Sequence, residues 1–191
     1  GKGAKPDRNV ILVPDKTDAV AEEFLEVMQG LGPRLGPLVL QFPFLADDVF
    51  PSRAEFLDRL DRFLERLPEG FRIAVEVRNK DLMNAKVAEL CRNRGACLVL
   101  VDQAWMPHAD EVMRRFDPLT TDYAYIRLLG DHKEMDRITT TWDKEVVDRT
   151  PRLRRWAEVI GSLLQREIPV FTYVNNHYAG HAPATVRRTA P

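Results

Sequence analysis

The sequence lacks a long hydrophobic run and carries almost no net charge. No run of about 18 apolar residues, the length that a membrane-spanning helix needs, occurs in the 191 residues. Lys and Arg total 28 against 29 for Asp and Glu, which gives a formal charge of -1. No overall field therefore attracts the chain to nucleic acid or to a membrane surface, and an anion-binding site must be local.

Cysteine is scarce as well. Cys91 and Cys97 are the two cysteines, and their spacing matches neither a metal-ligand motif nor a disulfide-rich pattern. The opening "GKGAKPDRNV" is not followed by the apolar core of a signal peptide. We therefore expect a cytoplasmic protein that does not act at membranes.

Strand-like and helix-like segments alternate along the chain. Short segments rich in β-branched and aromatic residues predict five strands, at 37–42, 71–78, 96–102, 123–130 and 169–175, and a sixth at 9–14. Apolar residues at helical spacing predict helices at 17–32, 52–68, 84–95 and 150–167, with Thr17, Ser52, Asn79 and Thr150 as candidate caps. This alternation is typical of parallel strands covered by helices.

Two parallel architectures fit this pattern: an open doubly wound sheet and a closed (β/α) barrel of the TIM type. No glycine-rich phosphate loop follows any predicted strand, which disfavours the open, nucleotide-binding version. With 45% hydrophobic residues, 191 residues are enough for one well-buried domain and too few for two. We expect a single α/β domain over residues 1–191.

The strand predicted within "FRIAVEVRN" becomes polar at its carboxyl end on one of its two faces. Because side chains alternate along a strand, Glu76 and Arg78 share one face, and the aliphatic Ile73, Val75 and Val77 take the other. The aliphatic face fits against helices. The polar face then points into a barrel interior, at the carboxyl end of the strand where barrel enzymes build their active sites.

Three further predicted strands end in polar residues at the same level. The same alternation groups Asp102 with Leu100, Arg127 with Tyr123 and Tyr125, and Tyr173 with Asn175 and His177. Four separate strands thus present polar side chains at one rim. This coincidence predicts a shared functional site.

Each of these residues also has a structural interpretation. Glu76 and Arg78 could form a buried ion pair that closes the barrel mouth, because buried charges need partners. Asp102 could cap the following loop or helix. Arg127 could form a structural ion pair instead of binding an anion. The sequence leaves these alternatives open.

The histidines and tryptophans also have either a functional or a structural interpretation. His177 and His181 are four residues apart, but the glycine between them argues against one continuous helix, so no metal site is predicted. Trp156 lies in an amphipathic helix and is expected in the core, whereas Trp105 and Trp142 follow strands and could line a pocket. The basic segment "PRLRRWAE" is typical of a solvated helix face.

Five segments of the chain carry a resemblance to a known family. They are "LGPLVLQFP", "FRIAVEVRN", "YAYIRLLG", "LRRWAEVI" and "FTYVNNHYAGHAPATV". In this order and spacing they resemble the YecE-like family, the bacterial and archaeal domain of unknown function 72, from about Phe24 to about Val186. Members have a TIM-barrel-like fold, and the resemblance implies such a fold here.

The resemblance implies no established activity. Similarity of the family's fold to sugar isomerases and apurinic endonucleases has suggested phosphoester or nucleic-acid chemistry, which is an analogy at the level of the fold. The residues that match the family's motifs are Gln41, Glu76, Arg78, Asp102, Arg127, Tyr173, Asn175, Asn176 and His177.

The sequence departs from the family at its amino-terminal side. Family members begin with two or three further βα units that are not found here, and the five or six predicted strands are fewer than the eight that close such a barrel. The resemblance therefore implies an incomplete barrel, truncated at the amino-terminal side. Because exposed strand edges are normally paired or covered, we expect the chain either to self-associate as a homo-oligomer through the uncovered edge or to be poorly soluble.

Two functions from different classes follow. In the first, the chain is an enzyme acting on an anionic substrate, phosphorylated or a nucleic acid. Its catalytic candidates are Glu76, Asp102 and His177, and its substrate-binding candidates are Gln41, Arg78, Arg127, Tyr173, Asn175 and Asn176. In the second, the rim is a non-catalytic binding site for a ligand or nucleic acid, and its charges form a structural network. The sequence identifies no cofactor.

Geometry separates the two functions. A pocket reachable from solvent, on which Glu76, Arg78, Arg127 and Asn175 converge, favours the enzyme. Mutual saturation of these groups favours the structural network.

Overall fold

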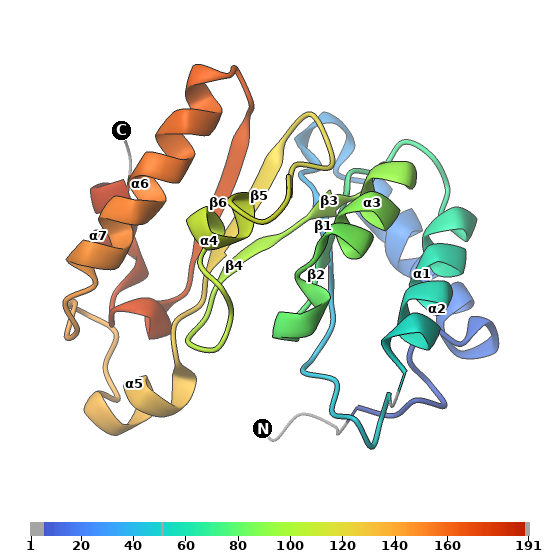
Figure 1. Cartoon of the computed structure of the whole chain (residues 1–191), viewed down its shortest axis with the longest axis horizontal. Coiled ribbons are helices and arrows are strands. Elements are labelled where there is room, and N and C mark those ends of the chain that lie inside the picture. Colours follow the sequence, from blue (N-terminus) through green and yellow to red (C-terminus); the bar gives the residue numbers. More distant parts are fainter. Residues whose placement is uncertain (1–5, 51, 190–191) are drawn as a thin grey trace.

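Short parallel strands form two sheets in the computed structural model, which describes residues 6–50 and 52–189 (Figure 1). The sheets have the strand orders β1-β2-β3 and β4-β5-β6, and all neighbouring strands are parallel. Only Val99 separates β3 from β4, and its N–H donates to the carbonyl of Val75 at 2.9 Å. The strands are β1 (Leu38–Gln41), β2 (Ile73–Glu76), β3 (Cys97–Leu98), β4 (Leu100–Asp102), β5 (Ala124–Leu128) and β6 (Val170–Val174).

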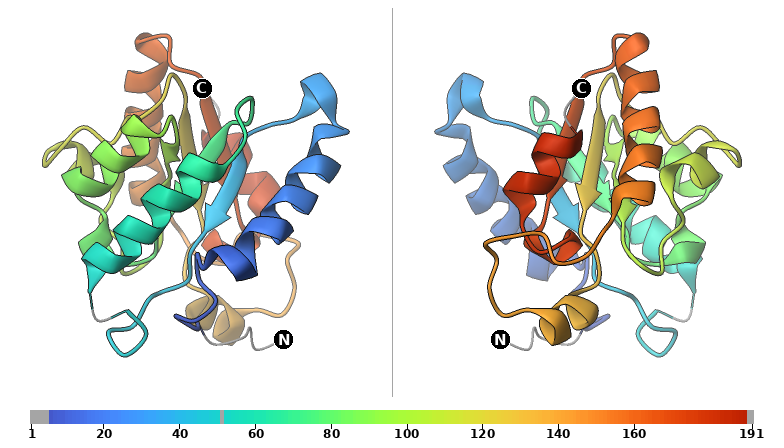
Figure 2. Two further views of the ribbon diagram at one scale, coloured as in Figure 1. Left: turned by 90° about the vertical axis from the view of Figure 1, so that its right-hand side faces the viewer. Right: turned by 90° about the vertical axis from the view of Figure 1, so that its left-hand side faces the viewer.

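Helices connect the successive strands, except that β4 follows β3 after Val99 alone. They are α1 (Pro14–Gln29), α2 (Arg53–Arg66), α3 (Ala85–Asn93), α4 (Ala109–Met113), α5 (His132–Ile138), α6 (Thr150–Gln165) and α7 (Ala182–Thr189), with single 3-10 turns η1 (Gly32–Arg34), η2 (Lys80–Leu82) and η3 (Asn176–Tyr178). Figure 2 shows α1 and α2 from one side of the molecule and α6 and α7 from the other. Within the described residues, no helix combines the length and apolar character needed to cross a membrane.

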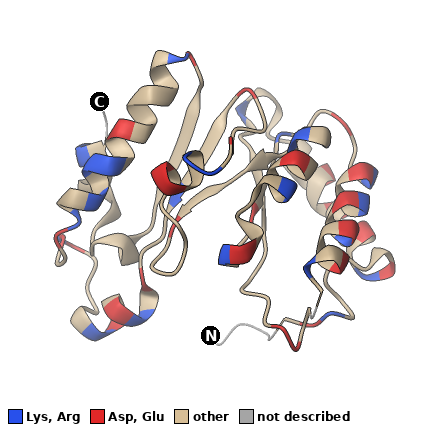
Figure 3. Ribbon diagram, in the orientation of Figure 1, with Lys and Arg blue, Asp and Glu red and all other residues tan. Residues whose placement is uncertain are grey.

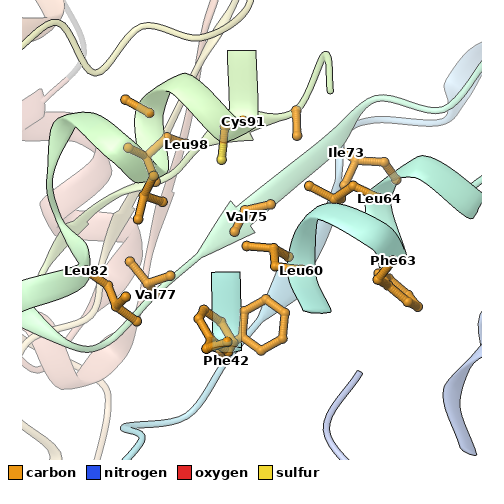
Figure 4. Packing of buried hydrophobic residues seen from close by; sticks show 14 of the residues in the cluster. Phe42, Leu60, Phe63, Leu64, Ile73, Val75, Val77, Leu82, Cys91 and Leu98 are labelled. Carbon is orange, nitrogen blue, oxygen red and sulfur yellow. The ribbon is translucent and has the colours of Figure 1, made fainter. Parts of the chain in front are cut away.

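Helices cover one face of both sheets, which we term the helix-covered face. In the first sheet, Ile73, Val75 and Val77 pack in one cluster with residues of α2 and α3 (Figure 4). In the second sheet, Leu100 and Ile126 pack with residues of α6, among them Leu153, Trp156, Val159 and Leu163. Fully burying such a side chain stabilises the fold by about 1.5–3 kcal/mol, so this face contributes most of the core.

The opposite face, which we term the open face, is lined by strand and strand-end residues. Its apolar cluster contains no helix residue from the described part of the chain. The cluster consists of Ala74, Cys97, Val99, Val101, Tyr123, Tyr125 and Leu129, with Val39 and Phe171 packed against it. The predicted alternation in β2, with the aliphatic residues facing helices and Ala74 on the other face, is confirmed.

The α/β class and the five predicted strand positions are confirmed, and the described residues form no closed barrel. The sixth strand predicted at 9–14 is wrong. Residues 8–12 form turns, Leu12 has a φ of 56°, and Pro14 is the first residue of α1. Proline has a backbone angle suited to the first helical turn, which explains why α1 begins here.

None of the four predicted caps makes a side-chain cap bond in the described residues. Asn84, and not Asn79, caps α3 by accepting from the N–H groups of Lys86 and Val87. The side chain of Asn79 instead bonds the backbone N–H and carbonyl of Leu45, both at 2.8 Å. The short helices α4, α5 and α7 were not predicted, because each is too brief to show helical periodicity.

Ser52 occupies the cap position of α2 without a side-chain cap bond. Thr17 lies inside the first turn of α1, and Thr150 is the first residue of α6. Three of the four candidate caps therefore lie close to helix starts without capping them.

An apolar pocket of about 320 Å³ lies between α1 and β1. Its lining includes Val20, Phe24, Leu25, Leu38 and Leu40. Val20 and Phe24 are 65% and 49% exposed, respectively. Self-association through this edge of the first sheet stays a prediction.

Candidate functional site

Glu76 organises a polar cluster at the carboxyl end of β2. The residue is fully buried, and its two carboxylate oxygens have different partners. Oε1 accepts from Nε of Arg78 at 2.9 Å, and Oε2 accepts from Nη1 of Arg127. The same Nη1 also donates to Oε1 of Gln41 at 2.9 Å. We call Gln41, Glu76, Arg78 and Arg127 the Glu76 cluster.

Strand register explains why these residues meet. Gln41 pairs with Glu76 across β1 and β2, and Arg127 pairs with Tyr173 across β5 and β6. Gln41 and Glu76 are on neighbouring strands, which lie about 4.8 Å apart. Arg127 is on β5, and its long side chain reaches Glu76 across the intervening β3–β4 segment. The predicted meeting of Glu76, Arg78 and Arg127 at one rim is confirmed.

The Glu76 cluster carries a net positive charge. One carboxylate faces two guanidinium groups, and these arginine side chains remain 23% and 24% exposed. Among the described residues, no hydrogen bond engages Nε or Nη2 of Arg127, or either Nη of Arg78. These unused N–H groups are donors for an anion, since guanidinium binds carboxylates and phosphates by forked hydrogen bonds.

Charged side chains are otherwise rare in the sheets. Figure 3 shows Lys, Arg, Asp and Glu mainly on helices and loops. The strands of the described chain contain three charged residues, which are Glu76, Asp102 and Arg127. Each is a buried or half-buried charge that needs a partner.

Asp102 was predicted to cluster with Glu76 at one rim; it lies at the carboxyl end of β4 but does not join the Glu76 cluster. Leu100 and Asp102 do share a face, but it is the helix-covered face, where Leu100 packs against α6. Cys97, Val99 and Val101 take the open face instead. Both alternating sets of side chains in this strand are apolar, so the sequence does not indicate which set faces the helices.

Asp102 is saturated by partners from α6 and η3. Its Oδ1 accepts from Nε of Arg152 at 2.6 Å, and its Oδ2 accepts from Trp156 at 2.5 Å and Tyr178 at 2.8 Å. Burial and the adjacent carboxylate raise the pKa of Tyr178. Asp102 thus ties the second sheet to α6, and the expected core position of Trp156 is confirmed.

A polar pocket of about 220 Å³ lies beside Asp102. Its lining includes Arg149 and Arg152, which are already paired with Glu134 and Asp102. The pocket lies on the other side of the sheet from the Glu76 cluster.

Aromatic rings extend along the open face toward the Glu76 cluster. Tyr125 stacks between Phe171, at 6.4 Å between ring centroids, and Tyr173, at 5.0 Å. Tyr125 is buried, and burial together with the neighbouring Tyr173 raises its pKa to about 12. Tyr173 is 50% exposed.

His177 lies in a second aromatic group at the rim. Its ring stacks on His132 at 3.8 Å between centroids and lies 4.6 Å from the ring of Trp142. Its Nε2 is 3.2 Å from Oδ1 of Asp136. Burial and the adjacent His177 lower the pKa of His132, while the carboxylate of Asp136 opposes this shift.

The asparagines of "VNNH" have local structural roles. Oδ1 of Asn175 accepts from the backbone N–H of His177 at 3.0 Å and lies 2.9 Å from its Nδ1, which orients the imidazole ring. Oδ1 of Asn176 accepts from the N–H of Ala182 at 2.8 Å, where α7 begins. Asn175 therefore positions His177 and does not reach the Glu76 cluster.

Sequence reasoning missed several residues that the fold brings to these sites. His132 and Asp136 join His177 from α5, and "GDH" after a strand could have been recognised as a helix start, because Asp131 caps α5. Gln103 follows the open-face Val101 by two residues, and its buried Oε1 has no partner in the described chain. No pattern in the sequence distinguishes it.

No metal centre emerges from the described residues. Within them, no group of three or more His, Cys, Asp or Glu side chains is arranged to hold an ion. The site is therefore described by its arginines, aromatic rings and histidine pair.

The fold and the site define an α/β protein of parallel strands with a polar, arginine-containing cluster at their carboxyl ends. The family model described as "Protein of unknown function DUF72" matches residues 8–190, so the chain belongs to the DUF72 family. This confirms the YecE-like resemblance. A comparison with curated proteins found no match.

Two solved structures of this family are similar to the chain. A DUF72 family protein from Thermotoga maritima MSB8 has 24% identity and a TM-score of 0.61, covering 88% of this chain and 62% of that one. A DUF72 family protein from Enterococcus faecalis V583 has 18% identity and the same TM-score of 0.61, covering 92% of this chain and 68% of that one. The chain thus spans less than two thirds of the Thermotoga protein, and the similarity concerns the fold.

Proposed function

We propose that this chain binds a small anionic ligand at the Glu76 cluster, with Arg78 and Arg127 as its contacts. The observation that carries the proposal is the unused guanidinium N–H groups beside a saturated carboxylate. Glu76 neutralises only one of the two charges and holds both arginines in place. The cluster is thereby prepared for an anion before one arrives.

The architecture supports this location. Six parallel strands, helices on one face and the likeness to DUF72 structures support a TIM-barrel-like arrangement. In such folds, ligands bind at the carboxyl ends of the strands. The Glu76 cluster lies at that end.

An enzymatic version of this function assigns proton transfer to His177. Both oxygens of Glu76 already accept from arginines, so the carboxylate is a poor general base. The ring of His177 is oriented by Asn175 and is stacked on His132, with 3.8 Å between the ring centroids. An imidazole ring can both donate and accept a proton, so it can serve as a general acid or base toward a bound ligand.

The saturation of Glu76 also supports the second function class, a non-catalytic binding site with a structural ion-pair network. Anion binding by Arg78 and Arg127 is common to both versions. A test of binding therefore precedes any test of turnover.

The test compares the wild type with Arg127→Lys by calorimetric titration with inorganic phosphate and ribose phosphate. Lysine keeps the charge but loses the planar fork, so we expect at least about tenfold weaker binding from the loss of one charge-assisted contact. Arg94→Lys is the matched control, because Arg94 is 26% exposed and pairs with Asp61 and Glu65 away from the rim.

Two results would oppose the proposal. One is unchanged phosphate affinity in Arg127→Lys together with a lowered melting temperature, which assigns the arginine a purely structural role. The other is the absence of phosphate binding to the wild type.

A further inference from the structure

The aromatic stack of the open face has one free end. The guanidinium of Arg72 lies 5.3 Å from the ring centroid of Phe171, and Tyr125 stacks between Phe171 and Tyr173. Phe171 and Tyr125 are thus in contact with neighbours along the stack. Tyr173 is its last member and is 50% exposed.

The free end of the stack lies beside the anion-binding groups. Tyr173 pairs with Arg127 in the register of β5 and β6, and both side chains belong to the open face. Adjacent strands are about 4.8 Å apart. A ring stacked on Tyr173 therefore brings a charged substituent of ordinary length within reach of Arg127.

We propose, building on the anion-binding function above, that the ligand is a small molecule with a planar aromatic ring bearing a phosphate or carboxylate. The ring stacks on Tyr173 as the next member of the aromatic stack. The anionic group accepts hydrogen bonds from the unused N–H groups of Arg127 and Arg78. The two halves of the ligand are recognised by two separate features of one face.

The packing of the tyrosines distinguishes this arrangement from an incidental exposed aromatic residue. Tyr123 and Tyr125 belong to the same face and are 5% and 6% exposed, so the face buries tyrosine rings where it has neighbours to do so. Single exposed aromatic residues are common on protein surfaces. Tyr173 differs because it continues an ordered stack and adjoins an arginine with unused donors.

The experiment measures affinity with paired probes that share an anionic group and differ in the ring. Adenosine monophosphate is compared with ribose phosphate, and indole-3-acetate with acetate, so that the two pairs distinguish a phosphate from a carboxylate ligand. Stacking of a base on an aromatic side chain is worth about fivefold to a hundredfold in affinity. We expect the ring-bearing probe of at least one pair to bind tighter by such a factor.

Two variants assign the ring preference to Tyr173. Tyr173→Phe keeps the stacking surface and should keep the preference, whereas Tyr173→Leu removes the ring and should abolish the preference. Thermal melting of both variants checks that the fold is retained.

The outcomes separate this inference from the proposed function. If ribose phosphate binds and ring-bearing probes bind no tighter, the inference fails and the proposed function stands. If Tyr173→Phe loses the preference as completely as Tyr173→Leu, the hydroxyl group and not stacking carries it, and the inference fails. If no anionic probe binds, both fail together.

Discussion

Glu76 and Asp102 are two buried carboxylates at the ends of parallel strands, on opposite faces of the sheets. Asp102 accepts from one arginine and from the neutral groups of Trp156 and Tyr178. Glu76 accepts from two arginines. One carboxylate is therefore neutralised by a single charge, whereas the other lies between two.

The difference shows how a buried carboxylate can serve packing on one face and ligand recognition on the other. On the helix-covered face, Asp102 uses its oxygens to fix a fully buried tryptophan, and this cluster has no net charge. On the open face, Glu76 orients two partly exposed guanidinium groups and leaves one positive charge for a ligand. The partners, and not the carboxylate, determine which role results.

The largest expected effect is a loss of free energy of unfolding when Asp102 on the helix-covered face is changed. Asp102→Ala leaves Arg152 without its partner and leaves the donors of Trp156 and Tyr178 unsatisfied, so we expect a loss of about 3–5 kcal/mol in the free energy of unfolding. Urea denaturation measures this loss. Asp61→Ala, which removes an exposed partner of Arg94, is the control and should cost less than about 1 kcal/mol. Equal losses in the two variants would show that Asp102 is not a packing centre.

A smaller effect is expected on the open face. Glu76→Gln leaves two arginines whose side chains are about a quarter exposed, and water can solvate them in part. We expect a loss of about 1–3 kcal/mol in urea denaturation, below that of Asp102→Ala. A loss as large as that of Asp102→Ala would remove the distinction between the faces.

The two arginines that face these carboxylates should separate binding from stability. Arg152→Lys should lower the melting temperature by about 2–4 °C, as expected for a loss of about 1 kcal/mol in a domain of this size, and leave phosphate affinity unchanged. Arg127→Lys should weaken phosphate binding and leave the melting temperature unchanged. Thermal melting and phosphate titration on both variants give four values, and a drop in affinity with Arg152→Lys would contradict the separation.

The smallest expected effect is a pH dependence at His108, whose ring centroid lies 4.6 Å from that of Trp156 on the helix-covered face. Burial lowers the pKa of His108 below its ordinary value of 6.5, and the charge of Arg155 adds to this, while the hydrogen bond to Asp110 opposes it. As the pH falls below 6.5, the unfolded chain binds a proton that the folded chain does not, so stability decreases with falling pH.

His108→Gln tests this linkage. Urea denaturation between about pH 5 and 8 should show a weaker decline for the variant than for the wild type, because the titrating group has been removed. An identical decline in both proteins would assign the pH dependence to other groups.

Residue patterns predicted much of the scaffold. The run "FRIAVEVRN" has one aliphatic and one polar phase, so its two faces were predicted correctly, and the same held for Tyr125 and Arg127. The amphipathic helices α2 and α6 were found for the same reason. The sixth strand was wrong because an apolar run of that length fits a turn and a helix start as well as a strand.

The sequence predicted that Glu76, Arg78 and Arg127 meet at one rim, but not which side chains pair there. Glu76 and Arg78 are two residues apart and share a face by strand geometry. The partner Arg127 is 51 residues from Glu76, and the partner Gln41 is 86 residues from Arg127. Strand order and register bring these residues together, and neither is written in a local pattern.

The sequence by itself determined the α/β class, the positions of five strands, the faces of β2 and the family, because each depends on local periodicity or on motifs within single segments. Tertiary structure decided that Asp102 faces α6, that Glu76 lies between two arginines, and that His132 meets His177. A strand with two apolar phases, such as Cys97 to Asp102, acquires its orientation only when helices cover one face. Charges acquire partners only when strands from distant parts of the chain pair in register.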